Sequence, residues 1–183
     1  MKIQIILGST RPGRAGEAVA KWTAESAKHA DAEFELVDIK DYDLPLLDEP
    51  MPASMHQYQH EHTKKWSQKI DEADGYIFVT PEYNHSVPGA FKNAVDYLYS
   101  EWANKAVGFI GYGASGASRA IEHWRGIAAQ FHLADVRESL HLSLATDFEN
   151  FHDFKPTDAH AEHLQKGVDE VVAWSGALKT LRS

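Results

Sequence analysis

Short runs of apolar residues recur along this chain, and between them lie longer stretches whose apolar positions follow helical spacing. The runs are rich in isoleucine, valine and phenylalanine, which is typical of strands buried on both faces of a parallel sheet. Their alternation with helices predicts an α/β fold. We predict strands at Ile3–Leu7, Phe34–Asp38, Gly75–Thr80, Ala106–Gly111 and, on a weaker pattern, Leu133–Arg137.

The helical stretches carry apolar stripes that would pack on such a sheet. In the last of them, Leu164, Val168 and Val171 recur at helical spacing. Pro156 and Thr157 come just before it and supply a start signal. We predict helices at Gly16–Lys28, Tyr58–Ala73, Gly89–Tyr99, Ala117–Phe131 and Asp158–Leu181.

Two stretches follow neither pattern. Asp43–Ser54 places three prolines among leucines and acidic residues, and Thr146–Pro156 mixes three phenylalanines with acidic residues. We interpret both as surface loops, with the rim of a pocket or a subunit contact as the alternative. Because the sequence contains no repeat, linker or low-complexity segment, we predict one domain that spans residues 1–183.

Composition narrows the function. The net charge is −9, with 27 acidic and 18 basic residues and no run of lysine and arginine, so nucleic acid is not an expected partner. The chain has no cysteine, which excludes disulfides and thiol chemistry and leaves redox chemistry to a bound cofactor. The apolar stretch at Met1–Gly8 is too short for a signal peptide, and nothing reaches a membrane-spanning length. We expect a cytoplasmic protein without membrane contact.

The loop after the first predicted strand, Gly8–Glu17, is suited to a phosphate. Arg11 and Arg14 offer fork-shaped donors that match phosphate oxygens. Ser9 and Thr10 add hydroxyl groups, and the helix that follows would direct free amides to the same point. The alternative is an ordinary turn with two solvated arginines. A nucleotide-triphosphatase loop is excluded, because Arg14 and the next residue, an alanine, stand where lysine and a hydroxyl residue are needed.

The loop after the third predicted strand, Pro81–Ser86, is suited to a flat ring. It places Tyr83 among polar groups at a strand end, where the aromatic ring can lie against a ligand. The carboxyl ends of strands in an open α/β sheet are where ligands bind. The alternative is a turn shaped by Pro81 and Asn84 in which Tyr83 packs on a neighbour.

The loop after the fourth predicted strand, Gly111–Gly116, consists of small residues that let backbone amides approach the same ring. It also matches the Gly-x-Gly-x-x-Gly dinucleotide fingerprint, with Asp135 nearly twenty residues further on. Two observations count against that alternative. The fingerprint normally opens the first strand–helix turn, and this loop contains no basic residue.

Other chemistries find less support. The chain has eleven histidines. Two pairs have helical spacing, His56 with His60 and His160 with His163. The sequence contains no His-Glu-x-x-His motif, however. We expect surface histidines and no metal site. A serine hydrolase would need Gly-x-Ser-x-Gly, and Gly113–Ala117 lacks the last glycine.

Three stretches of the chain together resemble the NADPH-dependent FMN reductase family, which includes quinone, azo-dye and chromate reductases. They are Leu7–Arg14, Pro81–Asp96 and Gly111–Gly116, and the second is long and highly specific. The resemblance implies a flavodoxin-like, doubly wound, five-stranded parallel sheet in the order 2-1-3-4-5, with helices on both faces and FMN across the strand ends.

The resemblance also implies site residues. Ser9, Arg11, Gly16 and Glu17 would surround the phosphate, the last two through their backbone amides. The ring would be bordered by Pro81, Glu82, Tyr83, Asn84, Gly113, Ala114, Ser115 and Gly116, with His85 placed to influence access. Arg14 departs from the family, in which many members have serine at that position.

The activity implied by the resemblance is transfer of hydride from NADPH or NADH to FMN and on to a small acceptor such as a quinone, azo compound, metal oxyanion or free flavin. The cofactor carries this chemistry, so no catalytic residue is assigned. The resemblance further implies a homodimer or homotetramer. The alternatives are a flavin-binding electron carrier or sensor, a dinucleotide-dependent dehydrogenase that uses Gly111–Gly116, and an interaction domain with an empty site.

Overall fold

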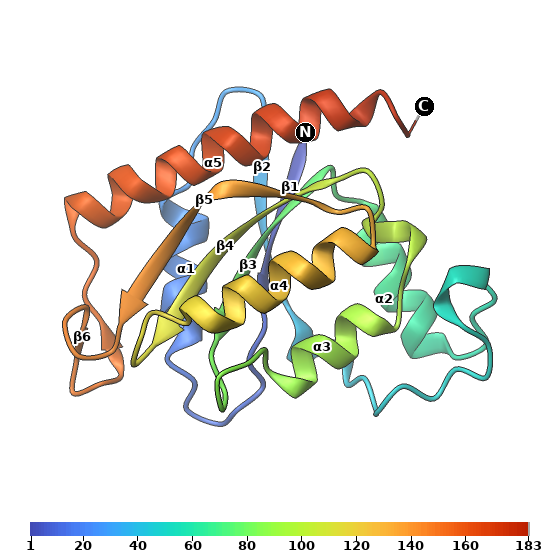
Figure 1. Ribbon diagram of the computed structural model, residues 1–183, viewed down its shortest axis with the longest axis horizontal. Coiled ribbons are helices and arrows are strands. Elements are labelled where there is room, and N and C mark those ends of the chain that lie inside the picture. The colour runs from blue at the N-terminus through green and yellow to red at the C-terminus, as the bar shows by residue number, and fades with distance from the viewer. Residues whose placement is uncertain (183) are drawn as a thin grey trace.

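The computed structural model describes residues 1–182 and is built around one five-stranded parallel sheet (Figure 1). Its strand order is β2-β1-β3-β4-β5, which confirms the predicted fold class. Each strand pairs in parallel with its neighbours, so all five carboxyl ends lie at one edge of the sheet. The strands are β1 (Lys2–Leu7), β2 (Glu33–Asp38), β3 (Gly75–Pro81), β4 (Ala106–Gly113) and β5 (Ala134–Ser143).

Helices cover both faces of the sheet. One apolar core joins α1 and α5 to one face, and a second, richer in aromatic residues, joins α2, α3 and α4 to the other. Figure 1 shows α5 on the side opposite to α3 and α4. The helices are α1 (Gly16–Ser26), α2 (Glu61–Asp71), α3 (Gly89–Asp96), α4 (Ser118–Gln130) and α5 (Asp158–Lys179), with short 3-10 helices η1 (Ile39–Tyr42), η2 (Ala53–Met55) and η3 (Ser100–Trp102).

Alternation along β1 explains how one strand serves both cores. Ile3 and Ile5 point to the face covered by α1 and α5, and Ile6 points to the other face. Gln4 is also fully buried, and its side-chain amide donates a hydrogen bond to the carbonyl of Lys69 in α2, 2.7 Å away. The side-chain nitrogen of Gln4 thus has a backbone partner, whereas its buried side-chain oxygen has none within residues 1–182.

Most predicted boundaries lie within two residues of the observed ones, and three ends differ by three residues or more: the end of β5, the start of α2 and the end of α3. The predicted last strand ends at Arg137, whereas β5 continues to Ser143 with Leu140 and Leu142 buried. The helix predicted from Tyr58 begins at Glu61, because the carboxylate of Glu49 accepts hydrogen bonds from the backbone amides at positions 59 and 60 and holds that segment outside the helix.

The stretch Thr146–Pro156 is not a plain surface loop. It contains a two-stranded antiparallel hairpin, β6 (Phe148–Glu149) and β7 (Asp153–Phe154), which Figure 1 shows beside the carboxyl end of β5. The ring of Phe154 meets the ring of Trp22 in α1 at 5.2 Å. Among residues 1–182, no helix is long and apolar enough to cross a membrane.

Candidate functional site

A cavity of about 280 Å³ opens where the carboxyl ends of β1, β3 and β4 meet. It brings together residues from all three loops that the sequence singled out, and it adds residues from the chain that follows β5. Its lining consists of Ser9, Arg11, Gly13, Arg14, Ala15, Pro81, Glu82, Tyr83, Tyr112, Gly113, Ala114, Leu144, Phe151 and His152.

The first two loops meet through a side-chain hydrogen bond. The hydroxyl groups of Ser9 and Tyr83 lie 2.8 Å apart, and Ser9 is only 1% exposed. The guanidinium of Arg11 lies 5.8 Å from the centre of the Tyr83 ring and, within residues 1–182, makes no hydrogen bond or ion pair. Arg11 therefore supplies a positive charge whose donors are available to a ligand.

Arg14 has a different environment from Arg11. Its guanidinium donates to both carboxylate oxygens of Asp38, at the end of β2, and to the backbone carbonyl of Ser9 at 2.5 Å. The Arg14 side chain is only 8% exposed. Although Arg14 lines the cavity, Asp38 balances its charge, so its donors are largely occupied by the protein itself.

The amino-terminal end of α1 points toward the first loop and has no side-chain cap at Ala15. Its first amides lack partners inside the helix, and that of Glu17 makes only a long bond of 3.4 Å to the carbonyl of Arg14, so this end of the helix is suited to an anion. Gly16 is required here, because a Cβ at this position would lie 2.2 Å from the hydroxyl oxygen of Tyr112. The Glu17 side chain turns away from the cavity to Lys21, at 2.7 Å, so only its backbone can serve the predicted role.

Tyr112 is a residue that sequence reasoning missed. Its hydroxyl group is buried and has no hydrogen-bond partner within the described residues, although Tyr112 lines the cavity. Burial, together with the nearby Tyr83, raises the pKa of this phenol above its ordinary value. The signal available in the sequence was its position inside the Gly111–Gly116 loop.

The ring loop is a tight turn. The backbone groups of Tyr83 and Ser86 exchange hydrogen bonds of 3.0 and 3.1 Å. Asn84 and His85 between them have φ values of 50° and 67°, as a two-residue type I′ turn requires. Tyr83 faces the cavity, whereas Asn84 and His85 form the tip of the turn outside its lining.

Glu82 joins the ring loop to α4. Its carboxylate accepts a hydrogen bond of 2.7 Å from Nε of Arg119 and further bonds from the amides of Arg119 and Ala120. Burial opposes ionisation of Glu82, but these bonds outweigh it and hold the pKa of the carboxyl below its ordinary value. A charged Glu82 therefore caps the amino-terminal end of α4.

The third loop contributes to the cavity with its first half. Gly113 and Ala114 line it, whereas Ser115 and Gly116 form the turn that leads into α4. Gly116 has φ of 60°, and a Cβ there would lie 2.8 Å from the Cβ of His141. Asp135, the acid of the dinucleotide alternative, lies near the start of β5, at the opposite edge of the sheet, where it is bound by Arg125. This placement counts against that alternative.

Two further expectations concern residues near the cavity. Thr10 is exposed and lines a separate hollow of about 660 Å³ between η1 and α3. Phe151 and His152 line the cavity at the strand ends, which favours the pocket rim that was the alternative for Thr146–Pro156, and Leu144, just before this stretch, lines it as well. Within residues 1–182, no group of three or more histidine or carboxylate side chains could hold a metal ion.

The strand order and the cavity at the carboxyl ends of β1, β3 and β4 define a flavodoxin-like α/β protein. The chain belongs to the NADPH-dependent FMN reductase family, whose model matches residues 1–147. This match confirms the resemblance inferred from the sequence.

Relatives and solved structures agree with this assignment. An NAD(P)H-dependent FMN reductase, ntnL, from Nectria sp is 48% identical over 126 residues, which cover 65% of this chain and 63% of that protein. A 2-hydroxy-1,4-benzoquinone reductase from Burkholderia sp is 30% identical and covers 95% of this chain and 96% of its own. In fold, FerB, a flavoenzyme NAD(P)H:(acceptor) oxidoreductase from Paracoccus denitrificans, aligns with a TM-score of 0.75 at 24% identity, over 96% of this chain and 97% of that chain.

Proposed function

We propose that this chain binds FMN in the cavity at the strand ends and acts as an NAD(P)H-dependent oxidoreductase with a small-molecule acceptor. The observation that carries the proposal is the convergence on one cavity of two kinds of donor that the described residues leave largely unsatisfied. They are the guanidinium of Arg11 and the amino-terminal end of α1, which has no side-chain cap.

The phosphate end of FMN fits the first loop. Arg11 offers an uncompensated charge, and the hydroxyl of Ser9 lies on the same cavity wall. We propose that the amides of Gly16 and Glu17, just outside the lining, turn to the phosphate, with Glu17 giving up its long bond of 3.4 Å to the carbonyl of Arg14. Arg14 holds the backbone of this loop through the carbonyl of Ser9. The phenol of Tyr112 packs against Gly16 and so fixes the position of the amino-terminal end of α1 beside the cavity.

The ring end of FMN fits between the second and third loops. Pro81, Tyr83 and the small residues Gly113 and Ala114 form opposing walls of the cavity. We propose that the amides of Asn84 and Ser115 bond to the polar edge of the ring, since the amide of Gly116 already donates to the carbonyl of Gly113 at 3.2 Å. His85, at the tip of the turn, would then influence which molecules reach the ring.

When bound, FMN supplies the redox chemistry, which is uptake of hydride from NADPH or NADH and its delivery to the acceptor. The chain's own residues bind and orient the reacting molecules, and none is assigned a proton-transfer role. The apolar side chains of Leu144 and Phe151 at the cavity suit a flat aromatic acceptor. We therefore propose a quinone as the acceptor class, in line with the name of the Burkholderia relative.

The test is anaerobic reduction of the reconstituted protein. The purified chain is loaded with FMN, freed of excess cofactor, and mixed with NADPH or NADH while the visible flavin absorbance is followed. Bleaching much faster than that of free FMN, with recovery of the colour on addition of a quinone, would support the proposal. Retained colour without bleaching would favour an electron carrier or sensor, and failure both to retain FMN and to turn over free FMN would overturn FMN binding.

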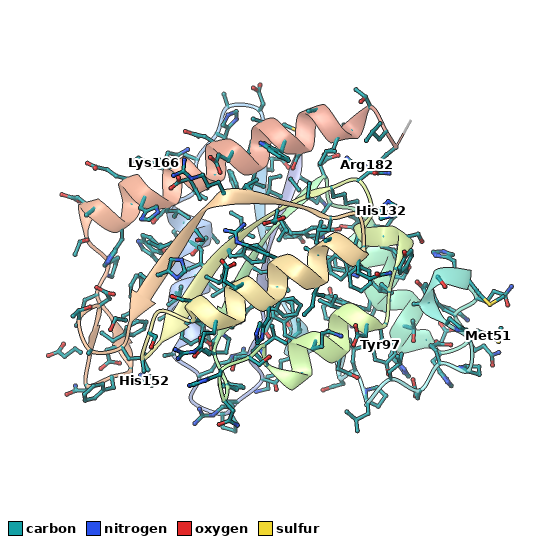
Figure 2. All side chains as sticks on the ribbon, viewed as in Figure 1. Met51, Tyr97, His132, His152, Lys166 and Arg182 are labelled. Carbon is teal, nitrogen blue, oxygen red and sulfur yellow. The ribbon has the colours of Figure 1, made fainter. Side chains whose placement is uncertain are left out.

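We further propose that the chain acts in the cytoplasm as a homodimer or homotetramer. Leu46, Leu47, Met51 and Met55 expose apolar side chains on the segment 43–56. Figure 2 shows Met51 on the side of the molecule away from His152. Apolar patches of this kind are typical of protein contacts. Light scattering coupled to gel filtration tests the assembly, and cell fractionation tests the location.

A further inference from the structure

The β6–β7 hairpin, residues 148–154, lies just beyond the part of the chain that the family model matches, which ends at residue 147. The tip of the hairpin nevertheless lines the cavity through Phe151 and His152. Figure 2 shows His152 near the carboxyl end of β5. The hairpin thus adds a wall to the cavity from outside the part of the chain that the family model matches.

The base of the hairpin is fixed by aromatic packing. The ring of Phe154 lies 5.2 Å from the rings of both Phe148 and Trp22, and Trp22 belongs to α1. The backbone conformation at the tip of the hairpin is less favourable, because Asn150 and Phe151 have φ values of 53° and 57°. Phe151 is 71% exposed, so burial of its own side chain does not hold it in this conformation.

The contact that fixes the tip is made by His152. Its Nε2 lies 3.0 Å from the carbonyl oxygen of Gly13 in the first loop, and its Nδ1 lies 3.1 Å from a carboxylate oxygen of Asp153. Both partners can only accept hydrogen bonds. A neutral imidazole carries one N–H, whereas the imidazolium carries two. Only the protonated ring makes both contacts, and these bonds raise the pKa of His152.

The charges around His152 favour an anion in the cavity. Arg14 is balanced by Asp38, and Glu17 by Lys21, while Arg11 has no carboxylate partner among residues 1–182. Asp153 neutralises part of the imidazolium, which is 57% exposed. The charged and titratable groups near the ring or in the hollows it lines are Arg11, Arg14, Glu17, Lys21, Glu82, Tyr83, Tyr112 and Asp153, with Lys155 acting on Asp153.

We propose that protonated His152 fastens the β6–β7 hairpin to the first loop over the phosphate end of the cavity and so slows the release of FMN. His152 is a positioning residue in this role, since it closes the site through the carbonyl of Gly13. The inference rests on the proposed function, because FMN is the ligand that it retains. Its consequence is that FMN leaves faster once the imidazole loses its second proton.

The experiment measures FMN release from the loaded full-length chain by timed rapid filtration at about pH 6 and about pH 9, on either side of the range in which histidines titrate. The variants are His152→Ala, which removes both bonds, and His152→Arg, which keeps two donors and a charge at both pH values. The control is His163→Ala, which removes a partly exposed histidine of α5 that faces the carboxylate of Glu138 in β5. Circular dichroism confirms that each variant is folded.

At about pH 6 we expect His152→Ala to release FMN roughly tenfold faster than the wild type, the effect of one charge-assisted hydrogen bond. At about pH 9 the wild type should approach the rate of that variant, whereas His152→Arg should stay slow and His163→Ala should follow the wild type. Equal rates for wild type and His152→Ala at about pH 6 would overturn the inference and leave the proposed function intact. A wild type that retains no FMN would instead overturn FMN retention and the inference together.

Discussion

The hydroxyl groups of Ser9 and Tyr83, 2.8 Å apart, join the loop that follows β1 to the loop that follows β3. Seventy-four positions separate these residues in the sequence, so the contact exists only because β1 and β3 are neighbours in the sheet. It fixes the distance between the part of the cavity suited to a phosphate and the part suited to a ring. The cavity is therefore largely formed before a ligand enters.

Removal of the hydrogen bond between Ser9 and Tyr83 should lower the stability of the protein without FMN. Tyr83→Phe removes one hydroxyl from a partly buried pair, and we expect the free energy of unfolding without FMN to fall by about 1 kcal/mol. Urea denaturation measures the loss. Ser9→Ala should give a similar loss, and the double variant should lose much less than the sum, since both changes remove the same bond. Additive losses would show that the two hydroxyl groups act independently.

Arg11→Ala should weaken FMN binding by about 1.5–3 kcal/mol, the range for a charge-assisted hydrogen bond, and leave the stability of the free protein unchanged. The physical reason is that the guanidinium of Arg11 makes no hydrogen bond or ion pair with residues 1–182 and lies 5.8 Å from the centre of the Tyr83 ring. Titration calorimetry with FMN measures the first quantity and urea denaturation the second. Arg137→Ala, an exposed arginine on β5, is the control. An unchanged FMN affinity would contradict the assignment of Arg11.

Arg14→Ala, unlike Arg11→Ala, should mainly lower the stability of the free protein. It leaves the carboxylate of Asp38 without its guanidinium partner and frees the carbonyl of Ser9, so we expect the free energy of unfolding without FMN to fall by about 2 kcal/mol. Asp38→Asn tests the same pair from the other side. Comparison of Arg14→Ala with Arg11→Ala by urea denaturation separates an arginine that supports the loop from one that serves the ligand. Equal stability of both variants would refute this distinction.

Gly16→Ala should destabilise the chain and disrupt the cavity, because the new Cβ would lie 2.2 Å from the Tyr112 hydroxyl. Overpacking of this kind costs about 1–3 kcal/mol. Gly126→Ala is the matched control, since Gly126 lies in α4 with nothing within 4 Å of its added Cβ and should gain up to about 1 kcal/mol. Thermal denaturation should therefore give shifts of opposite sign, and a stabilising Gly16→Ala would contradict the packing at Tyr112.

Because Lys105 is buried, we expect the stability of the protein to depend on pH. Its ammonium is almost fully buried beside Tyr76 and the carbonyls of Ile70 and Asp71, and burial lowers the pKa of Lys105 to about 8. Between this value and the ordinary pKa of 10.5, the unfolded chain holds a proton that the folded chain has lost. Stability contributed by this group therefore rises with pH across that window.

The variant that tests this prediction is Lys105→Met, which has no such proton. The difference in the free energy of unfolding between wild type and variant should move in favour of the wild type between about pH 7 and about pH 10. Urea denaturation of both proteins at the two pH values measures this difference. The other titrating groups are present in both proteins, so their contributions cancel. A constant difference would contradict a lowered pKa of Lys105 in the folded chain.

The fold was predictable because the buried strands carry continuous apolar runs. β3 is buried along its whole length, and a short continuous apolar run of this kind is typical of a strand covered on both faces. β5 was predicted too short because it lies at the edge of the sheet. There, polar residues alternate with Leu140 and Leu142, and the pattern is weaker than that of a strand buried on both faces.

The sequence predicted those site residues that lie within local motifs, and it did not predict contacts between distant segments. The loops at Ser9 and Tyr83 carry their chemistry in consecutive residues, and both line the cavity. The pairing of Arg14 with Asp38 depends on the adjacency of β1 and β2, which no local motif encodes. The position of His152 depends on a hairpin whose tip residues include a phenylalanine at positive φ, a conformation that its residue type does not indicate.

The cavity draws its lining from segments that extend from Ser9 to His152, so no shorter piece of the chain contains it. A ligand that occupies it binds the native chain and not the unfolded one. On the proposed function, FMN at a hundred times its dissociation constant would add about 2.7 kcal/mol to the free energy of unfolding. Supply of the vitamin from which FMN is made would then govern how long each newly synthesised copy survives proteolysis, in addition to whether it can turn over.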